Sequence, residues 1–366
     1  MFEIVITIIY IFLTINLIYW IFIFSKVSFY NSPFFRKEQA TAKIDETIVI
    51  IAAKNEQENL EKNLGTILKQ DAKGFSVLVV DDHSSDNTLN ILKKLQNIYP
   101  HLYVLKNIED KGKKHALSFA IRHTDKKYLL FTDADCYLYS KNWISKMISL
   151  FEDDKKIVIG YSPYTGNKIL SKFIRFETFM TALQYFGYTL SGIPYMGVGR
   201  NMAVEKSFFI SSGGYKSHFD LASGNDDLFI NENATKKNIA IQLDPDTFVY
   251  TDPPETLTSF IKQKTRHIST SFRYKFFHQL LLGLYSFSHI GFYLLLIISL
   301  FFLPVFNIIV IWIIRLLVIY LSSFRAFKKL KEQELLAILP VLDFLMFLYY
   351  VVIGIIYLFT PKNKWD

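Results

Sequence analysis

The chain has 366 residues, of which 51% are hydrophobic, a share too high for an ordinary soluble enzyme. The length leaves room for one catalytic domain and several membrane spans. The net charge of +8 includes no basic cluster among stacking aromatic residues, so it favours anionic lipid head groups over nucleic acid. The single cysteine, Cys136, excludes an internal disulfide and cysteine-based zinc sites, which is typical of a domain that faces a reducing compartment.

An almost uncharged apolar run from Ile4 to Phe24 is long enough to cross a bilayer, and it predicts a transmembrane anchor over residues 1–25. A secretory signal peptide is the alternative, but the acidic Glu3 precedes the run and no small-x-small cleavage site follows it. By the positive-inside rule, the basic residues after the run place this flank in the cytoplasm. They are Lys26, Arg36 and Lys37.

Residues 45–267 have the pattern of a cytoplasmic α/β domain, in which short β-branched runs alternate with helical stretches. This alternation predicts a mostly parallel, doubly wound sheet. The expected strands are Thr47–Ala52, Phe75–Val80, Leu102–Leu105, Tyr128–Thr132 and Ile157–Ile159. A Rossmann dehydrogenase is set aside, because its Gly-x-Gly-x-x-Gly turn is absent after the first strand.

Two carboxylates, Asp133 and Asp135, close the apolar run that begins at Tyr128. A buried strand would deliver both to the carboxyl edge of the sheet, where open α/β sheets bind ligands. Side chains two positions apart on an extended chain point the same way, so both could hold one divalent cation that bridges a diphosphate. For an isolated Asp-x-Asp the alternative is a solvated turn.

Three further polar segments stand at strand ends or helix starts. Lys54-Asn-Glu56 follows the first strand and Asp81-Asp-His-Ser-Ser-Asp-Asn-Thr88 follows the second; their carboxylates can accept hydrogen bonds from a nucleobase or a ribose. The second segment is also a good helix N-cap, which is its structural interpretation. Lys111-Gly-Lys-Lys-His115 opens a helix whose backbone N–H groups and lysines can approach phosphate.

An aromatic stretch with scattered charge occupies residues 168–190. We interpret it as a helix that lies in the membrane interface beside the active site. Ordinary core packing is the alternative.

Three more apolar runs predict a C-terminal membrane domain over residues 268–366. The spans are Phe277–Leu303, Phe306–Ser322 and Leu335–Phe359. The loop between the last two spans is basic, which predicts that it is cytoplasmic. Four spans with short connections put this loop and the α/β domain on the same side of the membrane, so both are expected in the cytoplasm. Arg315 and Asp343 interrupt these two spans at similar depth, so we predict a buried ion pair. The alternative is that Arg315 contacts a lipid phosphate.

Four motifs, in this order, resemble those of the inverting family 2 glycosyltransferases with the GT-A fold. They are Lys-Asn-Glu at 54–56, Val-Asp-Asp-His-Ser-Ser-Asp-Asn-Thr at 80–88, Lys-Gly-Lys-x-x-Ala-Leu at 111–117 and Asp-Ala-Asp at 133–135. The resemblance extends over residues 47–267, and the spans fit the membrane-integrated branch of cellulose and hyaluronan synthases and ceramide glucosyltransferases.

The resemblance implies that Asn55, Glu56 and Asp82 hold the nucleoside half of a nucleotide sugar, expected to be UDP-linked. It also implies that Lys113 adds positive charge near the phosphates. Asp133 would contact the ribose or the metal, and Asp135 would coordinate Mg²⁺ or Mn²⁺, which stabilises the leaving nucleoside diphosphate.

The resemblance extends to two later segments. Gly197-Val-Gly-Arg-Asn-Met-Ala203 resembles the segment that lines the family's acceptor and donor-sugar site. Asp226 and Asp227 stand at its acidic motif, and Asp227 matches the general base that takes the acceptor's proton, with Asp226 as the second candidate. Their structural interpretation is an acid pair at a helix N-terminus.

The last motif is Gln263-Lys-Thr-Arg-His267, which resembles the Gln-x-x-Arg-Trp motif of the processive branch. Gln263 and Arg266 match it and are expected at the donor, where Arg266 can form a forked contact with the diphosphate. His267 replaces the tryptophan, which argues against chain extension.

The sequence therefore predicts a membrane-integrated, metal-dependent glycosyltransferase that uses a nucleotide sugar. The expected acceptor is a membrane-associated lipid, and a growing polysaccharide is the alternative. A non-catalytic membrane module with the same fold would be expected to lack acids of the metal or base site, whereas Asp135 and Asp227 are both present.

Overall fold

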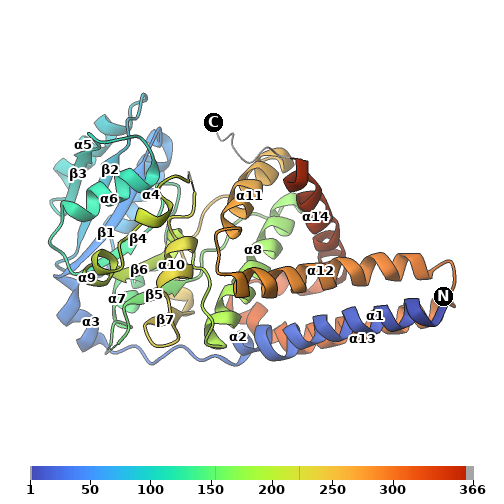
Figure 1. Cartoon of the computed structure of the whole chain (residues 1–366). Helices are drawn as coiled ribbons and strands as arrows, with labels where there is room; N and C mark the ends of the chain where they lie inside the picture. The colour runs from blue at the N-terminus through green and yellow to red at the C-terminus, as the bar shows by residue number, and fades with distance from the viewer. Residues whose placement is uncertain (1, 153, 222, 360–366) are drawn as a thin grey trace. The chain divides into compact units, whose positions relative to one another are not determined.

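A computed structural model of the chain describes residues 2–152, 154–221 and 223–359. The chain forms two compact units (Figure 1). The sheet unit contains residues 31–166 and 194–253, and the helical unit contains residues 1–30, 167–193 and 254–366. The segments 167–193 and 254–267, expected within the α/β domain, therefore belong to the helical unit.

Within the described residues, the sheet unit has one seven-stranded sheet with the order β3-β2-β1-β4-β6-β5-β7. Its strands are β1 (Thr47–Ala53), β2 (Ser76–Asp81), β3 (Leu102–Lys106), β4 (Tyr128–Phe131), β5 (Ile157–Gly160), β6 (Met202–Glu205) and β7 (Ile239–Gln242). The strands β3, β2, β1 and β4 are parallel neighbours, and β5 pairs in parallel with β7. Only β6 runs antiparallel to its neighbours β4 and β5. The mostly parallel α/β fold is confirmed, and β6 and β7 are strands that the sequence interpretation missed.

Helices connect these strands. They are α3 (Lys37–Ile44), α4 (Gln57–Leu68), α5 (Thr88–Ile98), α6 (Lys113–Arg122), α7 (Trp143–Ile148), α9 (Lys206–Ser211), α10 (Asp227–Asn233) and the 3₁₀ turns η2 (Gly199–Asn201), η3 (Lys216–His218) and η4 (Pro245–Thr247). The spacing of buried side chains makes α4 amphipathic: Leu60, Leu64 and Ile67 return to one face of the helix, which packs on the sheet.

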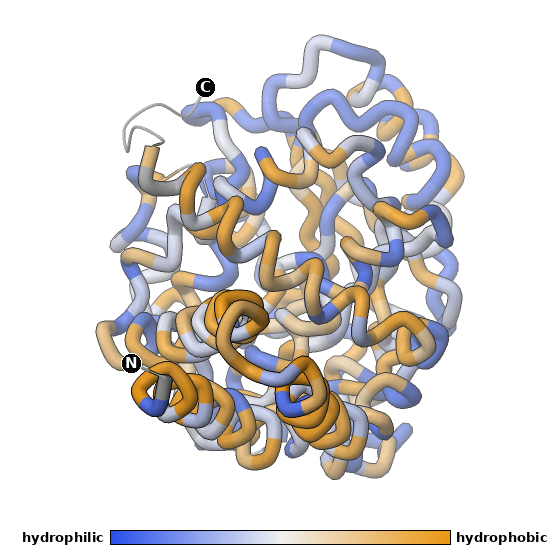
Figure 2. The backbone as a smooth tube through the Cα atoms, turned by 90° about the vertical axis from the view of Figure 1, so that its right-hand side faces the viewer, coloured by the Kyte–Doolittle hydropathy of each residue, from blue (hydrophilic) through white to orange (hydrophobic). Residues whose placement is uncertain are grey.

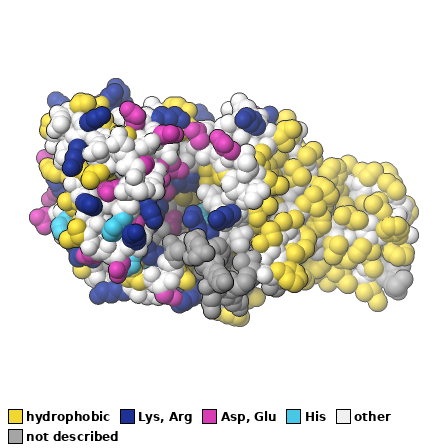
Figure 3. All heavy atoms as spheres, turned by 90° about the horizontal axis from the view of Figure 1, so that it is seen from above, with side chains coloured by type: hydrophobic (Ala, Val, Ile, Leu, Met, Phe, Trp, Pro, Cys, Tyr) yellow, Lys and Arg dark blue, Asp and Glu magenta, His cyan; other side chains and the backbone are white. Residues whose placement is uncertain are grey.

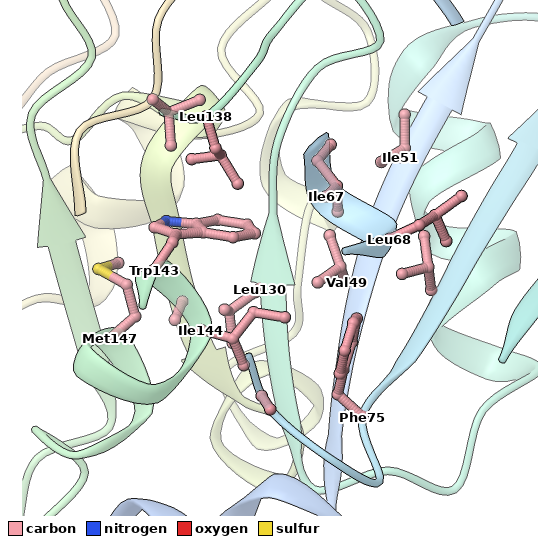
Figure 4. Packing of buried hydrophobic residues seen from close by; sticks show 14 of the residues in the cluster. Val49, Ile51, Ile67, Leu68, Phe75, Leu130, Leu138, Trp143, Ile144 and Met147 are labelled. Atoms are coloured by element: carbon pink, nitrogen blue, oxygen red, sulfur yellow. The ribbon is translucent and has the colours of Figure 1, made fainter. Parts of the chain in front are cut away.

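The core of the sheet unit explains why the central strands are apolar along their length. Every residue of β2 and β4 is buried, as expected for strands covered on both faces. Figure 4 shows Trp143 of α7 packed in this core between residues of β4 and α4. The Trp143 indole Nε1–H donates to Asn201 Oδ1 over 2.9 Å, so the one polar atom of the ring is satisfied although the ring is buried.

The helical unit contains the long apolar helices. The N-terminal segment runs through α1 (Phe2–Tyr19), the π-helical turn η1 (Trp20–Phe24) and α2 (Ser25–Phe29), and the other elements are α8 (Ile169–Leu190), α11 (Leu257–Ser271), α12 (Phe276–Ser299), α13 (Val305–Lys329), η5 (Gln333–Ile338) and α14 (Leu339–Phe359). Among the described residues, four helices are long and apolar enough to cross a membrane: Glu3–Phe29, Phe276–Ser299, Val305–Lys329 and Gln333–Ile356. These agree with the four predicted spans. Figure 2 shows that they are hydrophobic along most of their length, and Figure 3 shows the nearly continuous apolar surface they present.

Hydrogen bonds give the relative directions of these helices. Asn16 and Tyr19 of the N-terminal segment bond to Ser288 and Leu281 of α12, so the two helices are antiparallel. Ser28, at the end of the same segment, donates to the Ser322 carbonyl over 2.6 Å. Because Asn16 also bonds to Arg315, earlier on α13, the N-terminal segment and α13 run in parallel. This order is the one that alternating membrane crossings require.

The predicted ion pair between Arg315 and Asp343 is confirmed. Arg315 Nη2 donates to Asp343 Oδ1 over 3.2 Å, and Nη1 donates to Oδ2. Asn16 Oδ1 accepts from Arg315 Nε at 3.2 Å, and His289 Nδ1 lies 3.0 Å from Nη2. The Arg315 side chain is fully buried, so the structure favours internal pairing over a contact with lipid phosphate.

The aromatic stretch at 168–190 forms the helix α8, as predicted. Most of its residues are buried, including Phe176, Phe179 and Phe186. Phe179 stacks on Phe327 of α13 with ring centroids 4.0 Å apart. The packing supports the alternative interpretation, in which α8 is a core helix of its unit.

Candidate active site

The carboxyl edge of the sheet gathers most of the predicted site residues. Asp133 and Asp135 follow β4, and Glu56 follows β1, the neighbour of β4. Burial raises the pKa of Glu56, and the charges of Asp135 and Asp133 raise it further, while a hydrogen bond from Asn59 opposes the shift. The two loops therefore bring three acids close enough to interact.

Lys113 is the cation that pairs with the first aspartate of the Asp-x-Asp motif. Its Nζ lies 2.5 Å from Asp133 Oδ1. Burial would lower the pKa of Lys113, but the carboxylates of Asp133, Asp226 and Asp135 outweigh it and raise that pKa. The next residue has a different role: Lys114 is buried, and its Nζ donates to the carbonyls of His218 and Leu221. The two neighbouring lysines thus differ, because Lys113 contacts a carboxylate of the acid pair and Lys114 holds two backbone carbonyls.

Asp135 is held in place by neighbours that donate to both of its carboxylate oxygens. Thr251 Oγ1 donates to Asp135 Oδ2 over 2.9 Å, and the Cys136 thiol lies 3.5 Å from Oδ1. Burial raises the pKa of the Cys136 thiol, and the charges of Asp135 and Asp133 add to the shift. Cys136 is therefore neutral at physiological pH and acts as a weak donor.

The two aspartates of the acidic motif differ in their surroundings. Asp226, the N-cap residue of α10, accepts a hydrogen bond from the backbone N–H of Gly199, and its charge contributes to raising the pKa of Lys113. A side chain at position 199 would contact Asp226, because a Cβ there would lie 3.0 Å from its Oδ2. Asp227 is buried, and its Oδ1 accepts from the backbone N–H of Leu228 at 2.8 Å. Asp226 thus interacts with Lys113 and, through its backbone contact, with the segment around Gly199.

Asp82 is the most enclosed of the predicted donor residues. Its Oδ1 accepts from Asn107 Nδ2 over 2.9 Å and lies 3.2 Å from His83 Nδ1, and its Oδ2 accepts from the backbone N–H of Gly112 over 2.9 Å. Burial would raise the pKa of Asp82, but these hydrogen bonds outweigh it and lower that pKa. Gly112, the N-cap residue of α6, has a φ of +135°, a backbone conformation that residues with a side chain rarely adopt. Glycine is therefore needed at this position, where the backbone N–H contacts Asp82.

Asn55 joins the loops that follow β1 and β2. Its Oδ1 accepts from the backbone N–H of Ser85 over 2.8 Å, and its own N–H donates to Ser84 Oγ over 3.0 Å. Asn55 has a φ of +57°, a left-handed conformation that asparagine tolerates better than most residues. The polar segment after β2 is thus tied to the Lys-Asn-Glu segment.

Gln263 and Arg266 lie on α11, in the helical unit. Between them, Lys264 forms an ion pair with Glu177 of α8, with Nζ and Oε2 2.5 Å apart. Both of these side chains are largely buried, so the pair anchors α11 to α8. The structure therefore gives the Gln-x-x-Arg motif a structural lysine at its second position.

A cation of the expected kind fits the acids that are present. Within the described residues, no group of three or more His, Cys, Asp or Glu side chains is arranged to hold a metal by itself. Mg²⁺ is commonly held by one or two carboxylates together with substrate phosphates, so the pair Asp133 and Asp135 suits a metal that arrives with a diphosphate.

Sequence reasoning missed two contributors to this edge of the sheet. Arg200 lies in the Gly-Val-Gly-Arg-Asn segment, which the sequence associated with the site without giving the arginine a role. Its Cζ lies 4.7 Å from the centroid of the Tyr164 ring. The contact of Thr251 with Asp135 had no sequence signal, because the two residues are 116 positions apart.

Comparisons with known proteins agree with this architecture. Residues 48–208 match the family described as glycosyl transferase family 2. The poly-beta-1,6-N-acetyl-D-glucosamine synthase of Staphylococcus aureus (strain COL) is 25% identical over 222 residues, which cover 59% of this chain and 52% of that relative. The UDP-Glc:alpha-D-GlcNAc-diphosphoundecaprenol beta-1,3-glucosyltransferase WfaP of Escherichia coli is 29% identical over 119 residues, which cover 32% of this chain and 45% of that relative. The match therefore spans about half the length of these curated relatives.

Among solved structures, the mannosyltransferase PcManGT from Pyrobaculum calidifontis, in complex with GDP-Man and Mn²⁺, is similar with a TM-score of 0.62. The similarity covers 99% of both chains at 15% sequence identity. At this identity the match establishes the shared fold, which includes the helical elements as well as the sheet.

Proposed function

Because the chain carries a glycosyl transferase family 2 domain, we propose that it transfers a sugar with inversion from a nucleotide sugar, expected to be UDP-linked, to a membrane-associated acceptor. The observation that supports this most is the interaction of Lys113 with Asp133, Asp135 and Asp226 at the carboxyl edge of the sheet. In the proposed function, this cluster would supply an acid pair for a metal, a cation for the phosphates and a candidate base.

The donor would be bound by groups on either side of the Asp-x-Asp motif. Asn55 and Glu56 would receive the nucleoside, since their loops adjoin the acid pair. Asp82 would keep its role at the nucleoside with its remaining acceptor capacity, and its hydrogen bond from Gly112 also holds the start of α6, from which Lys113 extends. Gln263 and Arg266 keep their proposed role at the diphosphate, and this role rests on the motif resemblance alone.

Asp135 and Asp133 would hold Mg²⁺ or Mn²⁺, and the metal would act as a Lewis acid that stabilises the departing nucleoside diphosphate. Lys113 would exchange part of its contact with Asp133 for a phosphate oxygen, which a flexible lysine can do.

The acceptor hydroxyl needs a base that removes its proton as it attacks the anomeric carbon. We propose Asp226 in this role, with Asp227 as the second candidate, because the charge of Asp226 acts on Lys113, which contacts the acid pair.

A lipid acceptor is the preferred proposal. The absence of the tryptophan after Arg266 argues against chain extension, and the relative WfaP is named for a lipid-linked acceptor. The second candidate is a polysaccharide synthase, which the matched poly-beta-1,6-N-acetyl-D-glucosamine synthase favours.

The test is transfer from radiolabelled nucleotide sugars by membranes that contain the full chain. A panel of UDP-glucose, UDP-N-acetylglucosamine and GDP-mannose would be supplied with Mg²⁺ or Mn²⁺, and the products would be separated by organic extraction and by size. Discrete extractable glycolipid supports a lipid acceptor, and high-mass polymer supports the second candidate.

The matched control is Asp135→Asn, which removes one charge from the acid pair and should abolish metal-dependent transfer. Excess EDTA should have the same effect on the unsubstituted chain. Undiminished transfer by Asp135→Asn would contradict the proposed site.

A further inference from the structure

The topology of the sheet places Arg200 beside the Asp-x-Asp motif. Arg200 lies in η2, directly before β6, and β6 runs antiparallel to β4 with Met202 opposite Phe131. The amino end of β6 therefore meets the carboxyl end of β4, after which Asp133 follows. The charges of Asp135 and Asp133 also act on Arg200, where they help to raise the pKa of its guanidinium against the opposing effect of burial.

The residues on both sides of Arg200 fix its backbone. Asn201 is fully buried, and its Nδ2 donates to the carbonyls of Tyr161, at 2.7 Å, and Thr247, at 2.8 Å. On the other side, the backbone N–H of Gly199 donates to Asp226. The position of Arg200 is thus linked both to the core and to the proposed base.

The side chain of Arg200 is oriented by an aromatic ring. Its guanidinium lies over Tyr164, with Cζ 4.7 Å from the ring centroid, a geometry in which the cation is attracted to the π-face. Tyr164 forms an isolated β-bridge with Thr251, the residue that donates to Asp135. A chain of contacts therefore runs from Arg200 through Tyr164 and Thr251 to Asp135.

The N–H groups of Arg200 have no acceptor among the described residues: no hydrogen bond and no ion pair to its guanidinium is formed there. The neighbouring acids are engaged by other groups, with Lys113 on Asp133 and Thr251 on Asp135. A guanidinium that keeps some exposure and makes no protein hydrogen bond can offer its five N–H donors to a ligand. Planar forked donors of this kind match phosphate oxygens.

We propose that Arg200 binds a diphosphate group at the edge of the sheet. The inference rests on the proposed function, and it gives a role to an arginine to which the motif resemblance assigned none. The diphosphate has two possible sources, the nucleotide donor or a lipid diphosphate on the acceptor, and both present the same oxygens to the guanidinium.

The test measures binding to the full chain purified in detergent, with Mn²⁺ present. The probes are UDP, GDP, uridine and farnesyl diphosphate. Arg200→Gln should weaken diphosphate binding by about 10-fold to 100-fold, the range expected when charge-assisted hydrogen bonds to one group are lost. Arg200→Lys should lose less, because it keeps the charge but not the fork, and uridine binding should not change in either variant.

Arg122→Gln is the matched control, since Arg122 pairs with Glu109 on an exposed part of the sheet unit, and it should bind every probe as the unsubstituted chain does. Melting temperatures identify a variant that has lost its fold, and Arg200→Lys then remains as the test. A loss confined to UDP or GDP assigns the diphosphate to the donor, and a loss confined to farnesyl diphosphate assigns it to the acceptor.

Two outcomes overturn the inference, and they are distinguishable. If the unsubstituted chain binds UDP or GDP and both Arg200 variants bind all the diphosphates equally well, only the role of Arg200 fails. If the unsubstituted chain binds no diphosphate probe, the proposed function fails with it.

Discussion

Asp226 and Asp227 are adjacent in sequence but differ in what their carboxylates contact. Asp226 accepts from Gly199 and acts on Lys113, whereas Asp227 is buried with one oxygen on the N–H of Leu228. Adjacent residues at a helix start point in different directions, so one of the two can face the substrate while the other stabilises the helix.

We expect Asp226→Asn to lower kcat by about 10²-fold to 10⁴-fold, the usual contribution of a general base, and to change the affinity for nucleoside diphosphate little. Asp227→Asn should lower kcat by less than about tenfold, since an amide oxygen can still accept from Leu228. Single-turnover rates with labelled donor and calorimetry with UDP measure the two effects. Normal turnover in Asp226→Asn together with loss in Asp227→Asn would return the base role to Asp227.

The sequence predicted the acids of the site better than its cations. Asp133 and Asp135 were identified because a strand of apolar residues ends directly before them, which fixes where they lie. Lys113 was named from the motif resemblance alone, because only the fold shows that Lys114 reaches the carbonyls of His218 and Leu221. Arg200 was not singled out, since its importance depends on antiparallel pairing of β6, a strand without a sequence signal.

Among the elements, the strands found from the sequence are those with near-continuous apolar runs. β6 (Met202–Glu205) and β7 (Ile239–Gln242) were missed because each has only four residues and a polar last residue. Such a segment is too short to show the hydrophobic periodicity of a strand. The long apolar helices were predicted because a run of eighteen or more mostly apolar residues is long enough to cross a bilayer as a helix.

The pair Arg315 and Asp343 connects four helices of the helical unit. Arg315 of α13 bonds to Asn16 of α1, to Asp343 of α14 and to His289 of α12. Tyr293 of α12 also donates to Asp343. A buried charge that loses its partner is strongly destabilising, so this network specifies which helices pack together.

Arg315→Leu or Asp343→Leu alone should destabilise the protein by about 3–5 kcal/mol, because each leaves an uncompensated buried charge. The double substitution Arg315→Leu/Asp343→Leu should recover part of this loss, since it removes both charges together. Thermal unfolding in detergent, analysed as a double-mutant cycle, measures the coupling. Arg325→Leu, an exposed arginine near the end of the same helix, is the control and should change stability by less than about 1 kcal/mol. Additive effects of the two single substitutions would contradict a direct pair.

At the scale of the whole molecule, the helix directions bear on membrane topology. The N-terminal segment and α13 are parallel and end close together: Lys329 Nζ donates to the Val27 carbonyl over 2.9 Å, and Arg325 lies over the ring of Phe29 with its Cζ 5.3 Å from the centroid. Basic side chains near both helix ends complement the negative end of the helix dipole. By the positive-inside rule, we propose that both ends face the same, cytoplasmic side.

The proposed topology places the loop between α12 and α13 outside and the sheet unit with the basic loop inside. A cysteine introduced at the exposed Phe301 should therefore react with a membrane-impermeant maleimide in intact cells. Cysteines at the exposed positions Glu58 and Lys328 should react only after the membrane is permeabilised.

The unsubstituted chain serves as the background for this experiment, because its Cys136 is fully buried and its raised pKa keeps the thiol protonated and slow to react. Labelling at Glu58→Cys in intact cells would place the carboxyl edge of the sheet outside the cytoplasm. Labelling at both Phe301→Cys and Lys328→Cys in intact cells would show that α13 does not cross the membrane, although its length and apolar surface allow it. Only the proposed pattern puts Lys113 and Arg200, the proposed phosphate-binding cations, and the basic helix ends on the same side as the proposed donor, a soluble and highly charged nucleotide sugar.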